Sequence, residues 1–331
     1  MNILKKKAVP FLVLALALFC IFENSLYAET SSVKAADRIK NLEPNSGDDF
    51  DWKINEDFTE ITITKYKGKR ADVVFPATIQ DVPVTCIGES VFSGSGIRIT
   101  SVVIPGGVKE IGKNAFRECS DLTSVTLPEN IVIGESAFKS CKSLQSIEIP
   151  KGCTLKEYAF HCCSKLESVT LPEDLKVIPE GCFMGCCSLA NIKFPSTLKY
   201  IGSEAFGADY LSGPCPFTSV ELPEGLEYIE SGAFNCNTIT SVSLPKSLKW
   251  VEYGLIIGSN NISTITIAKG CAPKVINGKE GMDGRDIIKG ASINNSVKLQ
   301  KQLAEWKLTP AQKQDVNALY EDLLSYGIGE E

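Results

Sequence analysis

The side chains best suited to chemistry in this 331-residue chain are thirteen cysteines and a single histidine. His161 directly precedes Cys162 and Cys163, an arrangement that could supply a thiolate nucleophile with an imidazole base. In other copies of the repeat described below, the position of His161 holds Arg117, Lys139 or Met184. Those side chains usually face solvent, so we expect His161 at the surface. Acidic residues form no evident catalytic pair and the sequence has no phosphate-binding glycine loop, so we interpret the protein as a non-enzyme without cofactors.

Four of the cysteines follow a phenylalanine by three residues: Cys119, Cys141, Cys163 and Cys186. Stacking of repeated turns would align these thiols in an internal ladder, and we favour the interpretation that they are buried packing groups. Disulfides between adjacent turns are an alternative, because the spacing of coils is close to the permitted Cα separation. That alternative concerns Cys162, Cys163, Cys186 and Cys187. Metal binding is the third alternative, which the single histidine and the lack of a C-x-x-C pair disfavour, so we predict no metal site.

The cysteines belong to a repeat with the pattern I-G-x-x-A-F-x-x-C-x-x-L-x-x-I-x-L-P. One copy begins at Ile111 and ends at Pro128, and the next runs from Ile133 to Pro150. The intervals between anchoring phenylalanines are 22 to 24 residues, apart from one of 28, and their period lies in the range of leucine-rich repeats. The anchors are Phe92, Phe116, Phe138, Phe160, Phe183, Phe206 and Phe234, followed by Ile256 in a last copy.

Each part of the repeat has a physical reason. Val125 and Leu127 alternate with polar residues, which predicts a half-buried strand that Pro128 ends. The glycine after isoleucine permits a backbone turn, and the Ala-Phe pair is expected to begin a short helical or 3-10 turn. Its phenylalanine would stack on those of neighbouring copies as an aromatic spine. Since no coil buries its apolar face alone, we predict a mostly β, α+β leucine-rich repeat solenoid.

These motifs closely resemble the BspA-like family of bacterial leucine-rich repeat proteins, over roughly residues 61–270. The lead-in from Ile61 to Gly68, with the segments 74–76 and 82–88, is also similar to the N-terminal portion of that family. The resemblance implies a cell-surface or secreted protein that acts in adhesion, host-matrix binding or coaggregation, and it implies no catalytic residues. The 28-residue copy and the chain after Gly270 depart from the family pattern.

The chain divides into six expected segments. They are a signal peptide (1–28), a flexible leader (29–49), an N-terminal β cap with the first coil (50–85), the solenoid (86–272), a linker (273–295) and a helical C-terminal cap (296–331). The basic residues Lys5 to Lys7 and the apolar stretch 8–22 predict the signal peptide, with lipidation of Cys20 as an alternative. Partial alternation predicts a capping hairpin that turns near Asn55 to Asp57.

The C-terminal segment is expected to hold two helices, at 296–305 and 309–325. Thr309 would cap the second helix and Pro310 would occupy its first turn. A partner-binding tail is the alternative to a cap. The long copy inserts residues 207–217, a loop rich in proline and glycine that is either functional or neutral.

Two surfaces are candidates for binding. The residue before each Ile-Gly pair should point outward, and it is aromatic in three consecutive copies, as Tyr200, Tyr228 and Trp250. Lys199 and Lys249 precede two of these aromatics. We consider a partner-binding stripe or, alternatively, a ladder that stabilises neighbouring coils. The strands offer a second surface of small, mostly hydroxylated side chains.

Function follows from these features taken together. A net charge of −6 argues against nucleic-acid binding, and no segment would span a membrane after removal of the signal peptide. We predict an exported protein-interaction module, at the cell surface, secreted or periplasmic, that is adhesin-like and binds a protein ligand such as host matrix. The alternative is a structural protein of the envelope with no host ligand.

Overall fold

The computed structural model describes residues 42–92, 96–209, 213, 216–236, 238–252, 254, 262–276, 282, 285, 303 and 305–326. The chain separates into two compact units, Met1–Glu43 and Pro44–Glu331. All of the elements below belong to the second unit. The predicted signal peptide and Cys20 lie outside the described residues.

The second unit begins with the expected capping hairpin. A 3-10 turn, Gly47–Asp49, leads into β1 (Phe50–Ile54), which pairs antiparallel with β2 (Ile61–Tyr66). The turn between them is held by Asn55, whose Oδ1 accepts from the backbone N–H groups of Thr59 and Glu60. The core then begins where the ring of Phe50 packs on that of Tyr66 at 5.3 Å.

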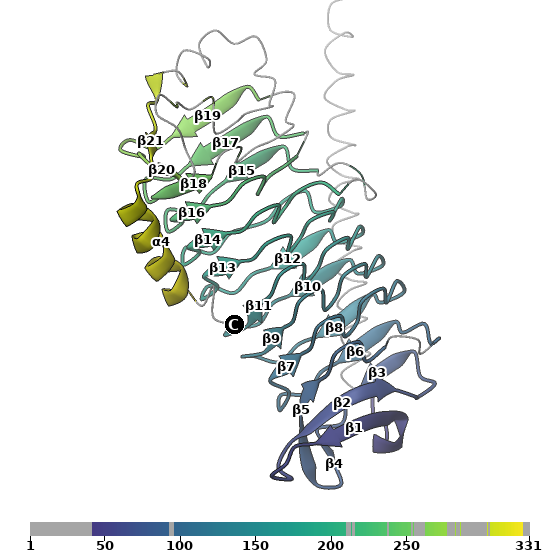
Figure 1. Cartoon of the computed structure of the whole chain (residues 1–331). Coiled ribbons are helices and arrows are strands. Elements are labelled where there is room, and N and C mark those ends of the chain that lie inside the picture. The colour runs from purple at the N-terminus through teal and green to yellow at the C-terminus, as the bar shows by residue number, and fades with distance from the viewer. Residues whose placement is uncertain are drawn as a thin grey trace, which may run out of the picture. The chain divides into compact units, whose positions relative to one another are not determined.

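Beyond the hairpin, most coils contribute two short strands, and the strands lie in two parallel rows (Figure 1). The coil between Phe183 and Phe206 contributes a strand to the second row only. The first row is β3 (Asp72–Val74), β6 (Ser101–Val103), β8 (Ser124–Thr126), β10 (Ser146–Glu148), β12 (Ser168–Thr170), β15 (Ser219–Glu221), β17 (Ser241–Leu244) and β19 (Thr264–Ile267). The second row starts from β2 and continues through β5 (Val82–Ile87), β7 (Glu110–Ile111), β9 (Val132–Ile133), β11 (Thr154–Leu155), β13 (Val177–Ile178), β14 (Tyr200–Ile201), β16 (Tyr228–Ile229), β18 (Trp250–Glu252) and β20 (Lys274–Ile276). A short β4 (Thr78–Ile79) pairs antiparallel with β5. This architecture is the predicted mostly β solenoid.

The register places equivalent repeat positions side by side. Ser146 pairs with Ser168 in the first row, and Tyr200 pairs with Tyr228 in the second. A side chain at one repeat position therefore neighbours the same position of the next coil, which is the geometry that builds ladders of like residues.

The turn around each phenylalanine differs from the expected short helix. Bonds of the 3-10 type do form, such as those from Ala115 N–H to Gly112 O and from Cys119 N–H to Phe116 O. Residues with positive φ interrupt them, however, at Asn114 (57°) and Glu118 (63°). The alternate N–H groups instead bond to the next coil, so the segment is a run of tight turns that continues the parallel pairing.

The repeated glycine serves close packing of coils more than conformational freedom. A Cβ at Gly134 would lie 2.5 Å from Ile111 O, and one at Gly202 would lie 2.5 Å from Glu180 N. Both contacts are with backbone atoms of the preceding coil, which cannot move aside without breaking the stack. In the coils that carry it, this glycine therefore permits the close approach of the preceding coil, which corrects the expectation that it serves mainly the turn. Other coils hold Lys156, Pro179 or Glu230 at the same position.

The predicted aromatic spine forms the centre of the core. Phe116 stacks on Phe138 with ring centroids 5.0 Å apart, and Phe138 stacks on Phe160 at 5.4 Å, with rings parallel to within 3°. The series extends from Phe92 to Phe234 through the remaining anchors, all of them buried.

The C-terminal region corrects one prediction. Thr309–Pro310 do not start a helix but form strand β21, parallel to β20, and the N–H of Ala311 bonds to Val275 O. Helix α4 (Lys313–Ser325) begins after Gln312, which shares a capping box with Asp315. Proline suits this place because it lacks only a donor that an edge strand does not need. Of the expected helix at 296–305, Leu303 and Glu305 are described and helical.

Helix α4 lies beside the second row of strands, along β13 to β18 (Figure 1). Within the part of the chain that the structure describes, no helix is both long and apolar enough to cross a membrane.

Candidate interaction surfaces and the thiol ladder

The aromatic stripe lies on β14, β16 and β18, and it is covered rather than exposed. Tyr200, Tyr228 and Trp250 are 6%, 3% and 7% exposed. They form a separate apolar cluster with Ile276 and with Leu319 of α4. The expectation that this stripe is exposed to solvent is therefore wrong, because the C-terminal helix packs over it.

The two lysines of the stripe take part in the same contact. Lys199 and Lys249 both pair with Glu227, at 2.8 Å and 2.5 Å, and Lys249 also approaches Asp322 of α4 at 3.6 Å. The Tyr326 hydroxyl donates at 3.0 Å to Oε2 of Glu227, the oxygen that also contacts Lys249. Burial alone would raise the pKa of Glu227, but its hydrogen bonds from the lysines and Tyr326 outweigh burial and lower the pKa. Glu227 therefore joins both lysines to the C-terminal end of α4.

Two further carboxylates, Glu230 and Glu252, hold adjacent coils together. Glu252 accepts from the Tyr228 hydroxyl at 3.1 Å and from the N–H of Ser231. Glu230 accepts from the N–H of Ser203 at 2.8 Å, and burial raises the pKa of this carboxyl. Each carboxylate thus bonds a backbone donor of the preceding coil. Sequence reasoning missed them, although both stand in the repeat position that glycine occupies in other coils.

The ladder cysteines point inward and bond to backbone. Cys141, Cys163 and Cys186 donate to carbonyl oxygens of the preceding coil, those of Phe116, Phe138 and Phe160, at 3.2 to 3.3 Å. All three are buried reduced thiols, so the packing interpretation is confirmed for them. A disulfide does occur elsewhere, at Cys236, whose partner lies outside the described residues.

Burial makes the ladder thiols unreactive. It raises the pKa of Cys119 to about 12, and it also raises the pKa of Cys141 and Cys186. Since the thiolate is the nucleophile, we expect these three cysteines to react with a thiol-specific disulfide reagent at pH 8 at least about a hundredfold more slowly than an unfolded-chain cysteine. Mass-spectrometric mapping of labelled sites, with the urea-unfolded protein as control, would measure this; rapid labelling of Cys141 in the native protein would contradict it.

His161 is not at the surface, which corrects the sequence expectation. It is 9% exposed, and its Nε2 lies 3.1 Å from Oδ2 of Asp209. Burial lowers the pKa of His161, an effect that the hydrogen bond with Asp209 opposes. One feature of the sequence pointed indirectly to this contact. Asp209 stands three residues after Phe206, at the position where earlier copies have the ladder cysteine.

The first row of strands presents an open surface, which we call the hydroxyl face. On β12 and β15 the inward valines, Val169 and Val220, are buried, whereas the flanking outward residues are exposed. The face consists of Ser124, Thr126, Ser146, Glu148, Ser168, Thr170, Ser219, Glu221, Ser241, Ser243, Thr264 and Thr266. Unlike the aromatic stripe, these side chains face solvent along the row.

A shallow polar hollow lies on the turn side of an early coil. Phe92, Ile97 and Cys119 line it together with Arg98 and Asp121, which form an ion pair at 2.5 Å. It has no convergent set of catalytic groups, and its charged residues neutralise each other. We assign it no site.

Comparison with known proteins identifies the repeats. The family model described as the BspA type leucine rich repeat region matches six copies, over residues 85–212 and 207–273. No curated protein matches the sequence.

Several solved structures are similar to this chain. A leucine-rich repeat protein of T. pallidum is 23% identical, with 81% of this chain and 100% of that chain covered and a TM-score of 0.36. A leucine-rich cell surface protein of Faecalibacterium prausnitzii is 23% identical (84% and 97% covered, TM-score 0.43), and the pneumococcal vaccine antigen PcpA is 16% identical (70% and 71% covered, TM-score 0.43). The repeat matches span more than half of the sequence, and the repeat positions they describe form the coils above; the chain belongs to the BspA-type leucine-rich repeat family.

Proposed function

We propose that this protein is an exported, non-enzymatic interaction module that binds a protein ligand through its hydroxyl face. The observation that supports this most directly is the alignment of exposed polar residues in register, as in Ser219, Ser241 and Thr264. Repeats of this family generally form interaction surfaces, and the aromatic stripe is unavailable while α4 covers it.

The chemistry of the hydroxyl face suits a large protein partner. Serine and threonine lose little side-chain entropy when they become ordered, in contrast with lysine or glutamate. Each hydroxyl can both donate and accept a hydrogen bond. Its charged members are Glu148 and Glu221, so the hydroxyl face favours a partner that offers backbone groups and a modest number of basic side chains.

The location that we propose is the bacterial cell surface, with an adhesin-like role toward host matrix. The predicted signal peptide at residues 1–28 and the family's bacterial surface proteins support export. Protease treatment of intact cells tests it, because a surface protein is degraded whereas a periplasmic structural component is protected. Protection would favour the envelope role instead.

Binding through the hydroxyl face is tested with Ser168→Arg/Thr170→Arg on the central strand β12. We expect this pair to weaken binding to an immobilised panel of fibronectin, collagen and laminin by at least about tenfold, because long charged side chains hold a flat partner away. Surface plasmon resonance measures the affinity.

A matched control introduces the same arginine side chain at hydroxyl residues elsewhere on the surface. Thr154→Arg and Ser196→Arg alter exposed hydroxyl residues away from the hydroxyl face and should leave affinity unchanged. Unaltered affinity of the Ser168→Arg/Thr170→Arg protein, or failure of every matrix protein to bind the wild type, would overturn the proposal.

A further inference from the structure

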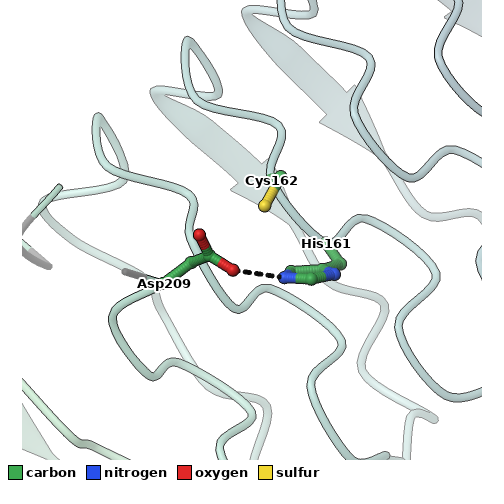
Figure 2. A group of neighbouring side chains, drawn as sticks. All are labelled: His161, Cys162 and Asp209. Carbon is green, nitrogen blue, oxygen red and sulfur yellow. Dashed lines mark hydrogen bonds and ion pairs between the residues drawn. The ribbon is translucent and has the colours of Figure 1, made fainter. Parts of the chain in front are cut away.

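Three potential metal ligands from two different coils meet on the turn side of the solenoid (Figure 2). They are His161, Cys162 and Asp209, and their ligand atoms all lie within 4.8 Å of one another. The imidazole Nε2 lies 3.1 Å from Oδ2 of Asp209, although 48 residues separate the two in the sequence. Figure 2 shows the carboxylate, the ring nitrogen and the Cys162 sulfur turned toward a common space.

The backbone explains how these groups meet. The N–H of Cys162 bonds to Met184 O, and the N–H of Gly185 bonds to Gly207 O, so the coil at Gly185 lies between the two ligand-bearing coils. Gly185 has a φ of 73° and carries no side chain. The coil in between therefore places no side chain at that position, and Asp209 reaches past it to His161.

Asp209 is a departure from the repeat. It occupies the position at which Cys141, Cys163 and Cys186 donate to a backbone carbonyl of the preceding coil. A carboxylate facing a carbonyl oxygen would be repelled and costly to bury. The longest coil begins here, and its carboxylate turns instead to His161 with 15% of the side chain exposed.

The imidazole is poised to act as a ligand. His161 is more than nine-tenths buried, and its Nδ1 has no hydrogen-bond partner among the described residues. The other ring nitrogen, Nε2, faces the Asp209 carboxylate, and in a neutral imidazole its lone pair can bind a metal ion.

We propose that His161, Cys162 and Asp209 bind one divalent transition-metal ion of borderline softness, represented by Zn²⁺. Nitrogen, sulfur and oxygen donors are the set that zinc accepts in proteins, at ~2.0–2.3 Å from the ion. Binding releases the thiol proton of Cys162 to solvent and leaves the carboxylate and neutral imidazole unchanged in charge.

The fourth position has a neighbouring candidate. Cys187 carries a reduced thiol and lies on the coil between those of Cys162 and Asp209. Its Sγ lies 3.5 Å from Gly213 O, within the same long coil as Asp209. Either Cys187 or a water molecule would complete a tetrahedron. The ion would join the longest coil to the coil at Phe160, across the one between them.

The test is metal binding by the full chain. Protein stripped with a chelator and held reduced is titrated with Zn²⁺ against a chromophoric competitor, and Co²⁺ is used as a spectroscopic substitute. We expect one ion per chain, a thiolate-to-cobalt charge-transfer band that Cys162→Ser abolishes, and at least about a tenfold loss of zinc affinity in Asp209→Asn and in His161→Gln.

Matched controls change the same residue types elsewhere. Cys86→Ser and Asp121→Asn should bind zinc as the wild type does, and circular dichroism of the metal-free proteins confirms that every variant is folded. Absence of stoichiometric zinc binding, undiminished binding by the folded Cys162→Ser and Asp209→Asn proteins, or mass spectrometry that finds Cys162 in a disulfide would each overturn the proposal.

Discussion

Replacing Phe138 with alanine is expected to lower the free energy of unfolding by about 3–5 kcal/mol, because it removes a ring from the middle of the spine. Phe138 is fully buried and stacked between Phe116 and Phe160. The cavity cannot collapse easily, since the coils on both sides are held by inter-coil hydrogen bonds such as that from Phe138 N–H to Ala159 O. Adjacent coils stabilise each other in a solenoid, so the loss extends to both neighbours.

Urea unfolding followed by circular dichroism measures this effect. Phe58→Ala is a matched control, because Phe58 lies in the hairpin turn with 72% of its surface exposed and should change stability by less than about 0.5 kcal/mol. If Phe138→Ala unfolded at the wild-type urea concentration, the stacked spine would not be the main source of stability in the central coils.

Replacing Trp250 with alanine should have a similar effect, about 3–5 kcal/mol, for a different reason. The indole is 7% exposed between the second row of strands and α4, in register with Tyr228 and Lys274. Truncation leaves a cavity and removes the surface on which Leu319 rests. We therefore expect a lower melting temperature together with faster proteolytic removal of α4.

This prediction separates a structural stripe from a ligand-binding one. An exposed binding stripe could lose its indole with almost no change in melting temperature. Leu319→Ser on α4 should reproduce the release of the helix, whereas Val316→Ser, one turn earlier and 42% exposed, should not. An unchanged melting temperature and unchanged proteolysis in Trp250→Ala would restore the stripe as a candidate ligand site.

Under the proposed function, the covered stripe contributes to stability and the open hydroxyl face to recognition, so the two rows of strands would have different roles. The apolar aromatics of the second row need a cover in water, and the chain supplies one in α4. The first row presents short polar side chains, which remain hydrated without a cover. A partner therefore meets the hydroxyl face without first displacing part of the protein.

Much of the architecture was predictable from the sequence because it depends on local, repeated contacts. The interval between Phe116 and Phe138 sets the length of a coil, and the alternation around Val125 determines which side chains of that strand point inward. Stacking equal coils then aligns equal residues, so the spine, the ladder thiols and the mostly β solenoid follow from the period alone. The N-terminal hairpin was also predictable, since its two strands are close in the sequence.

Only the tertiary structure decided which outward residues are exposed. The direction of Tyr200, Tyr228 and Trp250 could be read from the repeat, but their cover is a helix from the other end of the C-terminal region, outside the repeat pattern. The pairing of Thr309–Pro310 with β20 could not be predicted either, because it depends on the path of the chain between these two segments. His161 likewise resembled a solvent-facing residue until the long coil brought Asp209 beside it. Contacts between equivalent repeat positions determine the coil and can be read from the period of the sequence. Contacts between unlike segments depend on the path of the chain outside the repeats, and no periodic pattern in the sequence predicts that path.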